Sequence, residues 1–372
     1  MSRYKELRIA SVSDIHLGHR TNKTTDIVKN LRTAFPDNLE TGELDIIFIA
    51  GDVFDGLLTL DDNPYIADID LWIGNLLSIC SKRNIILRVL KGTPSHDWDQ
   101  SKRFEIIKQV CKYECDLKYV DNLHIEFIEA LGINVLYIPD ELESTSEKTL
   151  NRVKDMIKSK GLETVDYAIM HGQFEFQLPE FVKAQKHDSN EYLNLVSGLI
   201  FIGHVHKSSQ FKRIIAQGSF DRLSHGEEEP KGHMRAIRKK DGTHEITFIE
   251  NKNAKKYITV SCLDNSLEDS LTIIEKNVID LPNDSCVRVE LTPENPLSGN
   301  MDVLIRLYPT FNWTKIVRVE DEDDYIEIID DEVFSAITLT RDNLSQLLIP
   351  RIANKGCIDI LEAAELILNE CL

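Results

Sequence analysis

The sequence contains no long hydrophobic run. None of its apolar stretches approaches the roughly 18–20 residues that a membrane-spanning helix needs. The segment Met1–Ser13 passes from mixed charge directly into a short apolar strand, without the apolar core of a secretory signal peptide. We therefore expect neither membrane insertion nor secretion.

Paired cysteines are also missing. The chain has seven cysteines, an odd number, and no Cys-x-x-Cys motif. This pattern argues against a disulfide framework and against a zinc ribbon. It predicts reduced thiols and a cytoplasmic location, which for a viral protein would be the cytoplasm of the host.

Basic residues are scarce relative to acidic ones. The chain carries 43 Lys and Arg against 62 Asp and Glu, a formal net charge of -19. Residues 261–372 hold 23 acidic and 8 basic residues, so -15 of this charge lies there and only -4 in residues 1–260. The C-terminal part is therefore a poor phosphate-binding surface, whereas the nearly neutral N-terminal part is compatible with a polyanionic substrate.

The apolar pattern predicts an α/β fold. Short apolar strands alternate with helical periodicity as far as about residue 202, which is typical of a largely parallel sheet. The later strands are separated by turn residues, which predicts antiparallel pairing. These strands are 209–216, 234–240, 244–250 and 256–262.

The length of 372 residues suggests about two domains and a tail. We expect a main domain over 1–255, a smaller domain over 256–335 and C-terminal helices over 336–372. In the final helix, apolar residues between Cys357 and Cys371 recur on one face. That face either docks onto its own domain or binds a partner, and the sequence leaves both interpretations open.

One strand has a polar end of special interest. The apolar run Ile46–Ala50 reads as a buried strand, Gly51 allows a sharp turn, and Asp52 follows. Open α/β sheets place their ligands at this end of the strands. The two oxygens of Asp52 could bridge two cations, although an Asp here could equally cap the next helix.

Four other strand ends carry similar side chains. Carboxylates and imidazoles at one sheet edge suit manganese, iron or zinc, and two such ions can neutralise a phosphate ester and activate water. Six further histidines match no motif, and we expect them at the surface or in loops: His19, His124, His187, His225, His233 and His244. The five motifs are Ser13-Asp14-Ile15-His16-Leu17-Gly18, Gly51-Asp52-Val53-Phe54-Asp55, Gly92-Thr93-Pro94-Ser95-His96-Asp97, Met170-His171-Gly172 and Gly203-His204-Val205-His206.

In this order the motifs resemble those of the calcineurin-like metallophosphoesterase superfamily. Within it the chain resembles the SbcD-type exonuclease subunits of DNA repair and recombination, including phage-type nucleases. The resemblance covers about residues 7–250, and the segments 216–219 and 227–232 point to this branch. It implies a four-layer α/β/β/α sandwich, followed by a smaller α+β capping domain and a C-terminal helical tail.

The resemblance also implies two divalent ions, with Mn2+ as the expected metal. His96 would contact the scissile phosphate, stabilising the transition state or protonating the leaving oxygen. Asp97, which we group with His96 as catalytic, and Asp55 would orient His96 or the ligands. One ion would be held by Asp14, His16, Asp52 and His206, and the other by Asp52, His171, His204 and the residue before His96.

The third motif departs from the family pattern. The family has Gly-Asn-His-Asp, whereas this chain is two residues longer and has Ser95 where Asn stands. We take Ser95 as the replacement ligand, with a backbone carbonyl from 93–95 or a water as the alternatives. A hydroxyl is a weaker ligand than an amide oxygen, so we expect the second ion to bind more weakly than the first.

We therefore expect a manganese-dependent DNA nuclease. The resemblance implies exonuclease action on duplex ends, endonuclease action on single strands, an SMC-like ATPase partner of the SbcC type, and a homodimer formed through the helices at 64–82 and 101–112. Two alternatives remain open. One is another phosphodiesterase or phosphatase on the same dinuclear site, and the other is a catalytically silent subunit that scaffolds the ATPase.

Overall fold

The structure is a computed structural model that describes residues 5–58, 65–179 and 181–318. Its two largest elements are six-stranded mixed sheets, and a three-stranded sheet follows them along the chain. Within the described ranges, no helix is both long and apolar enough to cross a membrane.

The first sheet has the strand order β12-β11-β1-β2-β3-β4. Strands β1 to β4 are parallel. Strand β11 pairs antiparallel with β1, and β12 pairs antiparallel with β11 at the edge of the sheet. Every residue of β2 is buried, as expected of a central parallel strand covered on both faces. The strands are β1 (Leu7–Val12), β2 (Ile46–Ala50), β3 (Ile86–Leu90), β4 (Leu117–Val120), β11 (Gly232–Arg238) and β12 (His244–Glu250).

The second sheet has the strand order β5-β6-β7-β8-β10-β9. Strands β6, β7, β8 and β10 are parallel, and the two edge strands pair antiparallel. Its strands are β5 (His124–Ile128), β6 (Ile133–Ile138), β7 (Tyr167–Gly172), β8 (Ile200–His204), β9 (Ser209–Phe211) and β10 (Ile214–Ala216).

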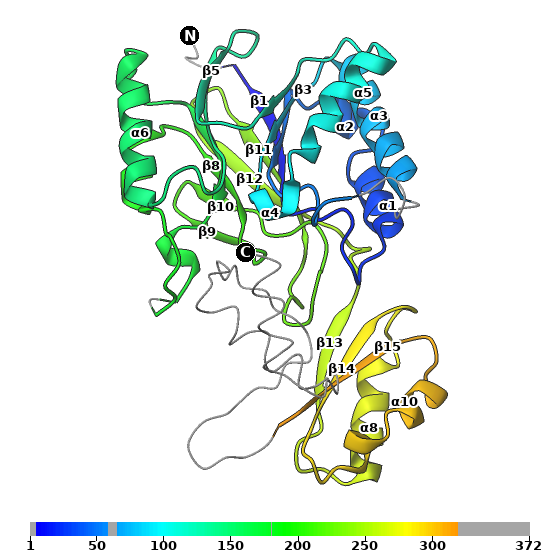
Figure 1. The fold of residues 1–372 in the computed structure, drawn as a ribbon. Coiled ribbons are helices and arrows are strands. Elements are labelled where there is room, and N and C mark those ends of the chain that lie inside the picture. The colour runs from blue at the N-terminus through cyan, green and yellow to red at the C-terminus, as the bar shows by residue number, and fades with distance from the viewer. Residues whose placement is uncertain (1–4, 59–64, 180, 319–372) are drawn as a thin grey trace, which may run out of the picture. The chain divides into compact units, whose positions relative to one another are not determined.

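The two sheets pack face to face, and helices cover their outer faces (Figure 1). Side chains alternate between the two faces of β2, so this one strand contributes residues to two apolar cores. Phe48 packs between the sheets against Phe201, whereas Ile47 and Ile49 face the helices. Helices α1 (Thr24–Ala34), α3 (Ile66–Arg83) and α5 (Arg103–Cys111) cover the first sheet, and α6 (Ser146–Ser159) and α7 (Ser189–Leu195) cover the second.

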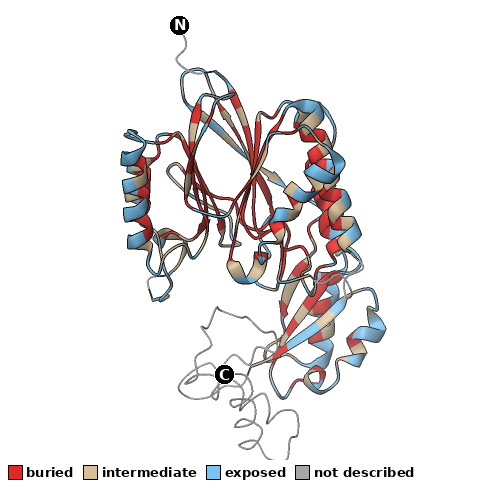
Figure 2. Cartoon of the chain, turned by 45° about the horizontal axis from the view of Figure 1, so that its top comes forward, coloured by how far each residue is buried: buried red, intermediate tan, exposed pale blue. Residues whose placement is uncertain are grey.

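The amphipathic pattern of the helices accounts for this cover. In α6, Leu150, Val153 and Ile157 recur at helical spacing and are buried against the second sheet. Figure 2 shows buried residues concentrated in the two sheets and on the inner faces of the helices. The predicted four-layer α/β/β/α arrangement is therefore confirmed.

A third, smaller sheet has the order β13-β14-β15 and its own apolar core. Both strand pairs are parallel, so the antiparallel pairing predicted for 256–262 is wrong. The reason is that a helix separates β13 from β14, and such a crossover brings the next strand back parallel. The elements are β13 (Tyr257–Ser261), α8 (Leu267–Val278), β14 (Cys286–Leu291), α9 (Pro296–Gly299), α10 (Asp302–Leu307) and β15 (Asn312–Val317).

Several elements were absent from the sequence-based prediction. The segment 209–216, predicted as one strand, is the hairpin of β9 and β10. The turns α2 (Leu39–Gly42) and α4 (Pro94–Asp97) are too short for periodicity to reveal. The main compact unit extends to Val317, and the predicted helices of 336–372 lie outside the described residues. The domain boundaries at 255/256 and 335/336 stay predictions.

Candidate metal centre

Five loops at the carboxyl ends of strands form the candidate site. Asp14 follows β1, Asp52 follows β2 and Thr93 follows β3, while His171 is the next-to-last residue of β7 and His204 ends β8. Because parallel strands of a sheet end at the same edge, and the two sheets stack face to face, these loops meet. Asp14, Asp52 and His171 are buried.

The backbone at the site is strained. Asp14, His16, Asp52 and His204 all have positive φ, at 51°, 54°, 48° and 104°. Non-glycine residues rarely adopt this conformation, and it is maintained where the surrounding structure holds it. Backbone hydrogen bonds from Ile15 to Asp52 and from Leu17 to Val53, both 2.8 Å, tie the first two loops together. The side chains are thus aimed by the backbone.

Position 92 must be glycine because the third loop lies very close to Asp52 there. A Cβ atom there would lie 2.1 Å from the backbone nitrogen of Asp52 and 2.2 Å from its Oδ1. Real Cβ contacts are never this short, so the third loop can reach Asp52 only because Gly92 has no side chain.

The first ligand group consists of Asp14, His16 and His206. Their ligand atoms lie within 4.8 Å of one another. His16 Nδ1 is 2.8 Å from Asp55 Oδ1, and His206 Nδ1 is 2.8 Å from Glu227 Oε1, so each imidazole donates its proton to a carboxylate. The two Nε2 lone pairs then face each other at 3.1 Å. A cation between them relieves that repulsion, so this donor set fits a metal ion.

The second ligand group consists of Asp52, His171 and His204, again within 4.8 Å of one another. His171 donates from Nδ1 to the carbonyl oxygen of Ala50 at 2.7 Å. Its Nε2 therefore turns a lone pair toward Asp52 Oδ2, 3.2 Å away. Two acceptors facing each other in a buried site again fit a divalent cation.

Asp52 and its neighbouring histidines shift one another's pKa values. Burial alone would raise the pKa of Asp52, but His171 and the hydrogen bond from His96 outweigh it and hold that pKa well below its usual range. Burial opposes protonation of His171, yet the Asp52 charge raises the pKa of His171 well above 6.5. The field of an ionised Asp52 thus attracts positive charge into this site, as a proton or as a metal ion.

His96 lies at the open side of the site. Its Nδ1 is 2.9 Å from Asp52 Oδ2, and 40% of its side chain is exposed. The hydrogen bond with Asp52 is the main cause that raises the pKa of His96. His96 also forms a third group with His16 and Asp55 whose ligand atoms lie within 4.8 Å of one another. It can therefore present a proton to a ligand that enters from solvent.

The structure corrects the assignment of Ser95. Ser95 is exposed on α4, and its carbonyl oxygen accepts a hydrogen bond from Trp98 Nε1. Thr93 occupies the place beside the second group instead, with its hydroxyl 3.2 Å from Asp52 Oδ2. The family pattern aligns the two extra residues before Ser95, whereas in the structure Pro94 and Ser95 follow Thr93 as the first turn of α4.

Asp97 contacts the backbone of two loops that carry candidate ligands. Its carboxylate is fully buried and accepts backbone hydrogen bonds from Val53, Phe54 and Gly92 at 2.7–3.2 Å. Burial, followed by the charge of Asp52, raises the pKa of Asp97 to about 6. Asp97 therefore fixes the second and third loops against each other, and its orientation of His96 or the ligands stays a prediction.

Sequence reasoning assigned no role to three side chains of the site. Asp140 Oδ2 lies 3.5 Å from His204 Nδ1, and Glu227 holds His206. Lys231, 1% exposed, pairs with Glu227 at 3.0 Å and with Glu229 at 2.8 Å. Asp140 follows β6, so the same rule that selected Asp14 and Asp52 would have found it. Nothing local marks Lys231 as buried.

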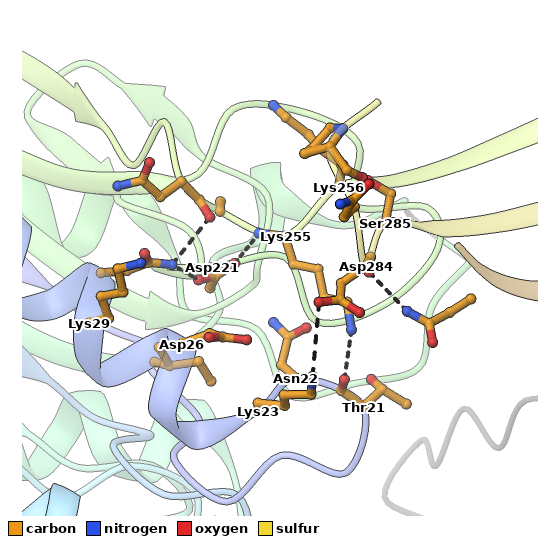
Figure 3. A pocket seen from close by; sticks show the side chains of 17 residues that line it. Thr21, Asn22, Lys23, Asp26, Lys29, Asp221, Lys255, Lys256, Asp284 and Ser285 are labelled. Atoms are coloured by element: carbon orange, nitrogen blue, oxygen red, sulfur yellow. Dashed lines mark hydrogen bonds and ion pairs between the residues drawn. The ribbon is translucent and has the colours of Figure 1, made fainter. Parts of the chain in front are cut away.

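A cavity of about 390 Å³ lies elsewhere, beside the start of α1 (Figure 3). Several of its polar groups contact one another: Lys255 Nζ donates to the carbonyl oxygen of Thr21 at 2.9 Å, and Asp221 accepts from Asn30 at 2.7 Å. None of the described residues that line this cavity belongs to the candidate ligand groups of Asp and His side chains. We therefore assign it no part in the candidate centre.

Comparisons with known proteins add little. No protein-family model and no curated protein matches the chain. Among solved structures, the protein TT1561 of Thermus thermophilus is 12% identical with a TM-score of 0.37, covering 66% of this chain and 99% of its own. A second solved structure has 10% identity and the same TM-score and coverage. Likeness at this level carries no argument about fold or function.

Proposed function

We propose that this protein is a dinuclear-metal phosphodiesterase that cleaves DNA. The observation that carries the proposal is the position of Asp52. Its Oδ2 lies 3.2 Å from His171 Nε2 in one ligand group and 3.9 Å from His16 Nε2 in the other. A single carboxylate between two sets of imidazoles is the arrangement that two neighbouring cations need.

Bound divalent cations, Mn2+ in our proposal, supply charge neutralisation for the phosphate and lower the pKa of a water. Other residues of the chain orient the side chains that would hold these ions. Asp55 and Glu227 fix the tautomers of His16 and His206, and the carbonyl of Ala50 fixes that of His171. His96 donates a hydrogen bond to a phosphate oxygen or protonates the leaving oxygen.

The choice of DNA as substrate rests on the resemblance of the five motifs to SbcD-type nucleases. The acidic net charge of the chain supports a separate subunit that binds the DNA, because few basic residues are available to hold a long polyanion. We therefore propose an SMC-like ATPase of the SbcC type as the partner that engages DNA, with end processing in repair or recombination as the role and the cytoplasm as the location.

Self-association through α3 and α5 is part of the proposal. These helices pack on each other through Trp72 and Phe104, whose rings lie 5.8 Å apart. They also expose large apolar side chains: Leu71 is 56%, Ile106 57% and Val110 75% exposed. Sedimentation equilibrium of the wild type and of Val110→Glu tests this dimer, which the substitution should dissociate.

The decisive experiment uses purified protein with Mn2+ and end-labelled linear duplex DNA, with and without the ATPase. We expect release of nucleotides by the wild type and no release by Asp52→Ala. Cleavage of a chromogenic phosphodiester but not of DNA would identify another phosphodiesterase on the same site. Mn2+ binding without cleavage of either substrate would identify a silent scaffold subunit. Full cleavage by Asp52→Ala would refute the assignment of the centre.

A further inference from the structure

The hydroxyl of Thr93 lies among all three members of the second ligand group. Its Oγ1 is 3.2 Å from Asp52 Oδ2, 3.4 Å from His171 Nε2 and 3.3 Å from His204 Nδ1. Three nearly equal separations of this size are those of neighbouring ligands around one small cation, because metal–ligand bonds of about 2.0–2.2 Å place adjacent ligands slightly more than 3 Å apart.

The chain fixes Thr93 in this position. Its backbone N–H donates to Asp52 Oδ1 at 2.6 Å, so backbone and side chain both engage the same carboxylate. Pro94 follows and restricts Thr93 to extended backbone, which it adopts with φ -59° and ψ 127°. The residue is 6% exposed, and a β-branched side chain has few rotamers. The restricted backbone and the few side-chain rotamers therefore keep the hydroxyl facing the ligand group.

Asp140 is placed to accept the proton of that hydroxyl. Its Oδ2 lies 3.2 Å from Thr93 Oγ1, while its Oδ1 accepts from the backbone N–H of Glu141 at 2.9 Å. A threonine hydroxyl has one proton and two lone pairs. When the proton is directed to Asp140, a lone pair is free to point toward Asp52, His171 and His204.

We propose that Thr93 Oγ1 is the fourth ligand of the Asp52, His171 and His204 group, and that Asp140 is the positioning residue that accepts its proton. The inference rests on the metal centre of the proposed function. Asp140 Oδ2 also lies 3.5 Å from His204 Nδ1, but Asp140 is not a member of the group whose ligand atoms all lie within 4.8 Å of one another, so we assign it a positioning role. A neutral alcohol hydrogen-bonded to a carboxylate thus replaces an amide oxygen.

Mn2+ calorimetry on metal-free protein tests this assignment independently of catalysis. Thr93→Val removes the hydroxyl while keeping the side-chain shape, Thr93→Ser keeps the hydroxyl, and Ser95→Ala removes the exposed hydroxyl nearby. We expect Thr93→Val to weaken one of two binding events by at least the roughly 10–100-fold that loss of a supporting contact costs. Thr93→Ser and Ser95→Ala should bind as the wild type does.

Asp140→Asn should weaken the same event by roughly 10–100-fold, because the amide accepts the Thr93 proton less strongly. Combining each substitution with His206→Ala, which removes a ligand of the other group, leaves the Thr93 site to be titrated alone. Circular dichroism establishes that each variant is folded. If Thr93→Val does not fold, the Mn2+ affinities of Thr93→Ser and Asp140→Asn are compared instead, and only Asp140→Asn should bind more weakly.

The outcomes separate this inference from the proposed function. Two Mn2+ ions bound by the wild type with unchanged affinity in Thr93→Val would overturn the role of Thr93 alone. Loss of affinity in Ser95→Ala and not in Thr93→Val would restore Ser95 as the ligand. Absence of any Mn2+ binding by the wild type would reject the metal centre itself.

Discussion

Glu227 Oε1 lies 2.8 Å from His206 Nδ1. The imidazole is 21 residues earlier in the chain, and the carboxylate fixes which of its nitrogens carries the proton. Burial opposes protonation of His206, but the Glu227 hydrogen bond raises the pKa of His206. The same pair holds the pKa of Glu227 well below its usual range despite the burial of the carboxyl group.

Glu227→Gln should therefore weaken Mn2+ binding at the group of Asp14, His16 and His206. The amide can donate as well as accept, so it no longer fixes the His206 tautomer, and a loss of roughly 10–100-fold in affinity is expected. Calorimetry with Mn2+ measures it. Glu245→Gln, which removes the same charge from the exposed face of β12, is the control and should bind as the wild type does. Equal affinities in both variants would contradict the role of Glu227.

Lys231 is the buried cation of the same cluster, and its loss should destabilise the fold. Lys231→Met leaves Glu227 and Glu229 without their ammonium partner, and removing one member of a buried ion pair costs about 3–5 kcal/mol. Urea unfolding in the presence of a chelator measures the free energy. The matched control is Lys239→Met, whose pair with Glu245 is exposed and should contribute little to stability. Similar losses in the two variants would refute this account.

Much of the site could be predicted because it depends on strand ends. Asp14, Asp52, His171 and His204 each follow or end an apolar run, and parallel topology brings such ends together. The four-layer fold follows from the same alternation of strands and helices.

The remaining residues depend on information that a local pattern does not contain. Our proposal of Thr93 in place of Ser95 depends on a helical turn of four residues, α4, which is too short to show periodicity. The burial of His233, which we expected at the surface or in a loop, follows from the pairing of β11 with both β1 and β12. Only long-range pairing makes β11 an interior strand.

That buried histidine should make the fold sensitive to acid. Burial, and to a lesser extent Arg235, lowers the pKa of His233 to about 3 from its ordinary 6.5. Between these values the unfolded chain takes up a proton that the folded chain does not, so stability is present above pH 6.5 and is lost as the pH falls toward 3. The expected slope is about 1.4 kcal/mol per pH unit.

His233→Gln removes this term, since glutamine does not titrate. Urea unfolding of chelated protein at pH 7.5 and pH 5 should show a drop in the wild type that is larger by about 2 kcal/mol than in the variant. Comparing the two proteins cancels the contribution of the other histidines. An identical pH dependence in both would show that His233 is protonated in the folded state.

Gly92→Ala should disrupt the centre while leaving the rest of the domain in place. The new Cβ would lie 2.1 Å from the backbone nitrogen of Asp52, so the second or third loop must move. Overpacking of this kind costs about 1–3 kcal/mol and here should also reduce Mn2+ binding. Gly74→Ala in α3 is the matched control, because its Cβ would meet nothing closer than 3.9 Å, and it should stabilise the helix by about 1 kcal/mol. Unchanged Mn2+ binding in Gly92→Ala would contradict the close approach.

His96→Gln separates transition-state chemistry from metal binding. His96 contacts Asp52 through Nδ1 and leaves Nε2 for the substrate, so its loss should reduce kcat on DNA by roughly 10²–10⁴-fold, the usual contribution of a positioned acid. The hydrogen bond with Asp52 raises the pKa of His96, so the protonated form persists to higher pH and is lost as the pH rises through that pKa. The alkaline fall of kcat should therefore be present in the wild type and absent in the variant.

The Mn2+ stoichiometry of His96→Gln completes this test. We expect it to equal that of the wild type, because Asp14, His16 and His206 and the group around Asp52 keep all their ligand atoms. Loss of one bound ion would instead assign His96 as a ligand in the group that it forms with His16 and Asp55, whose atoms also lie within 4.8 Å of one another. In that case the fall in kcat would report a missing cation, and the general-acid role of His96 would be withdrawn.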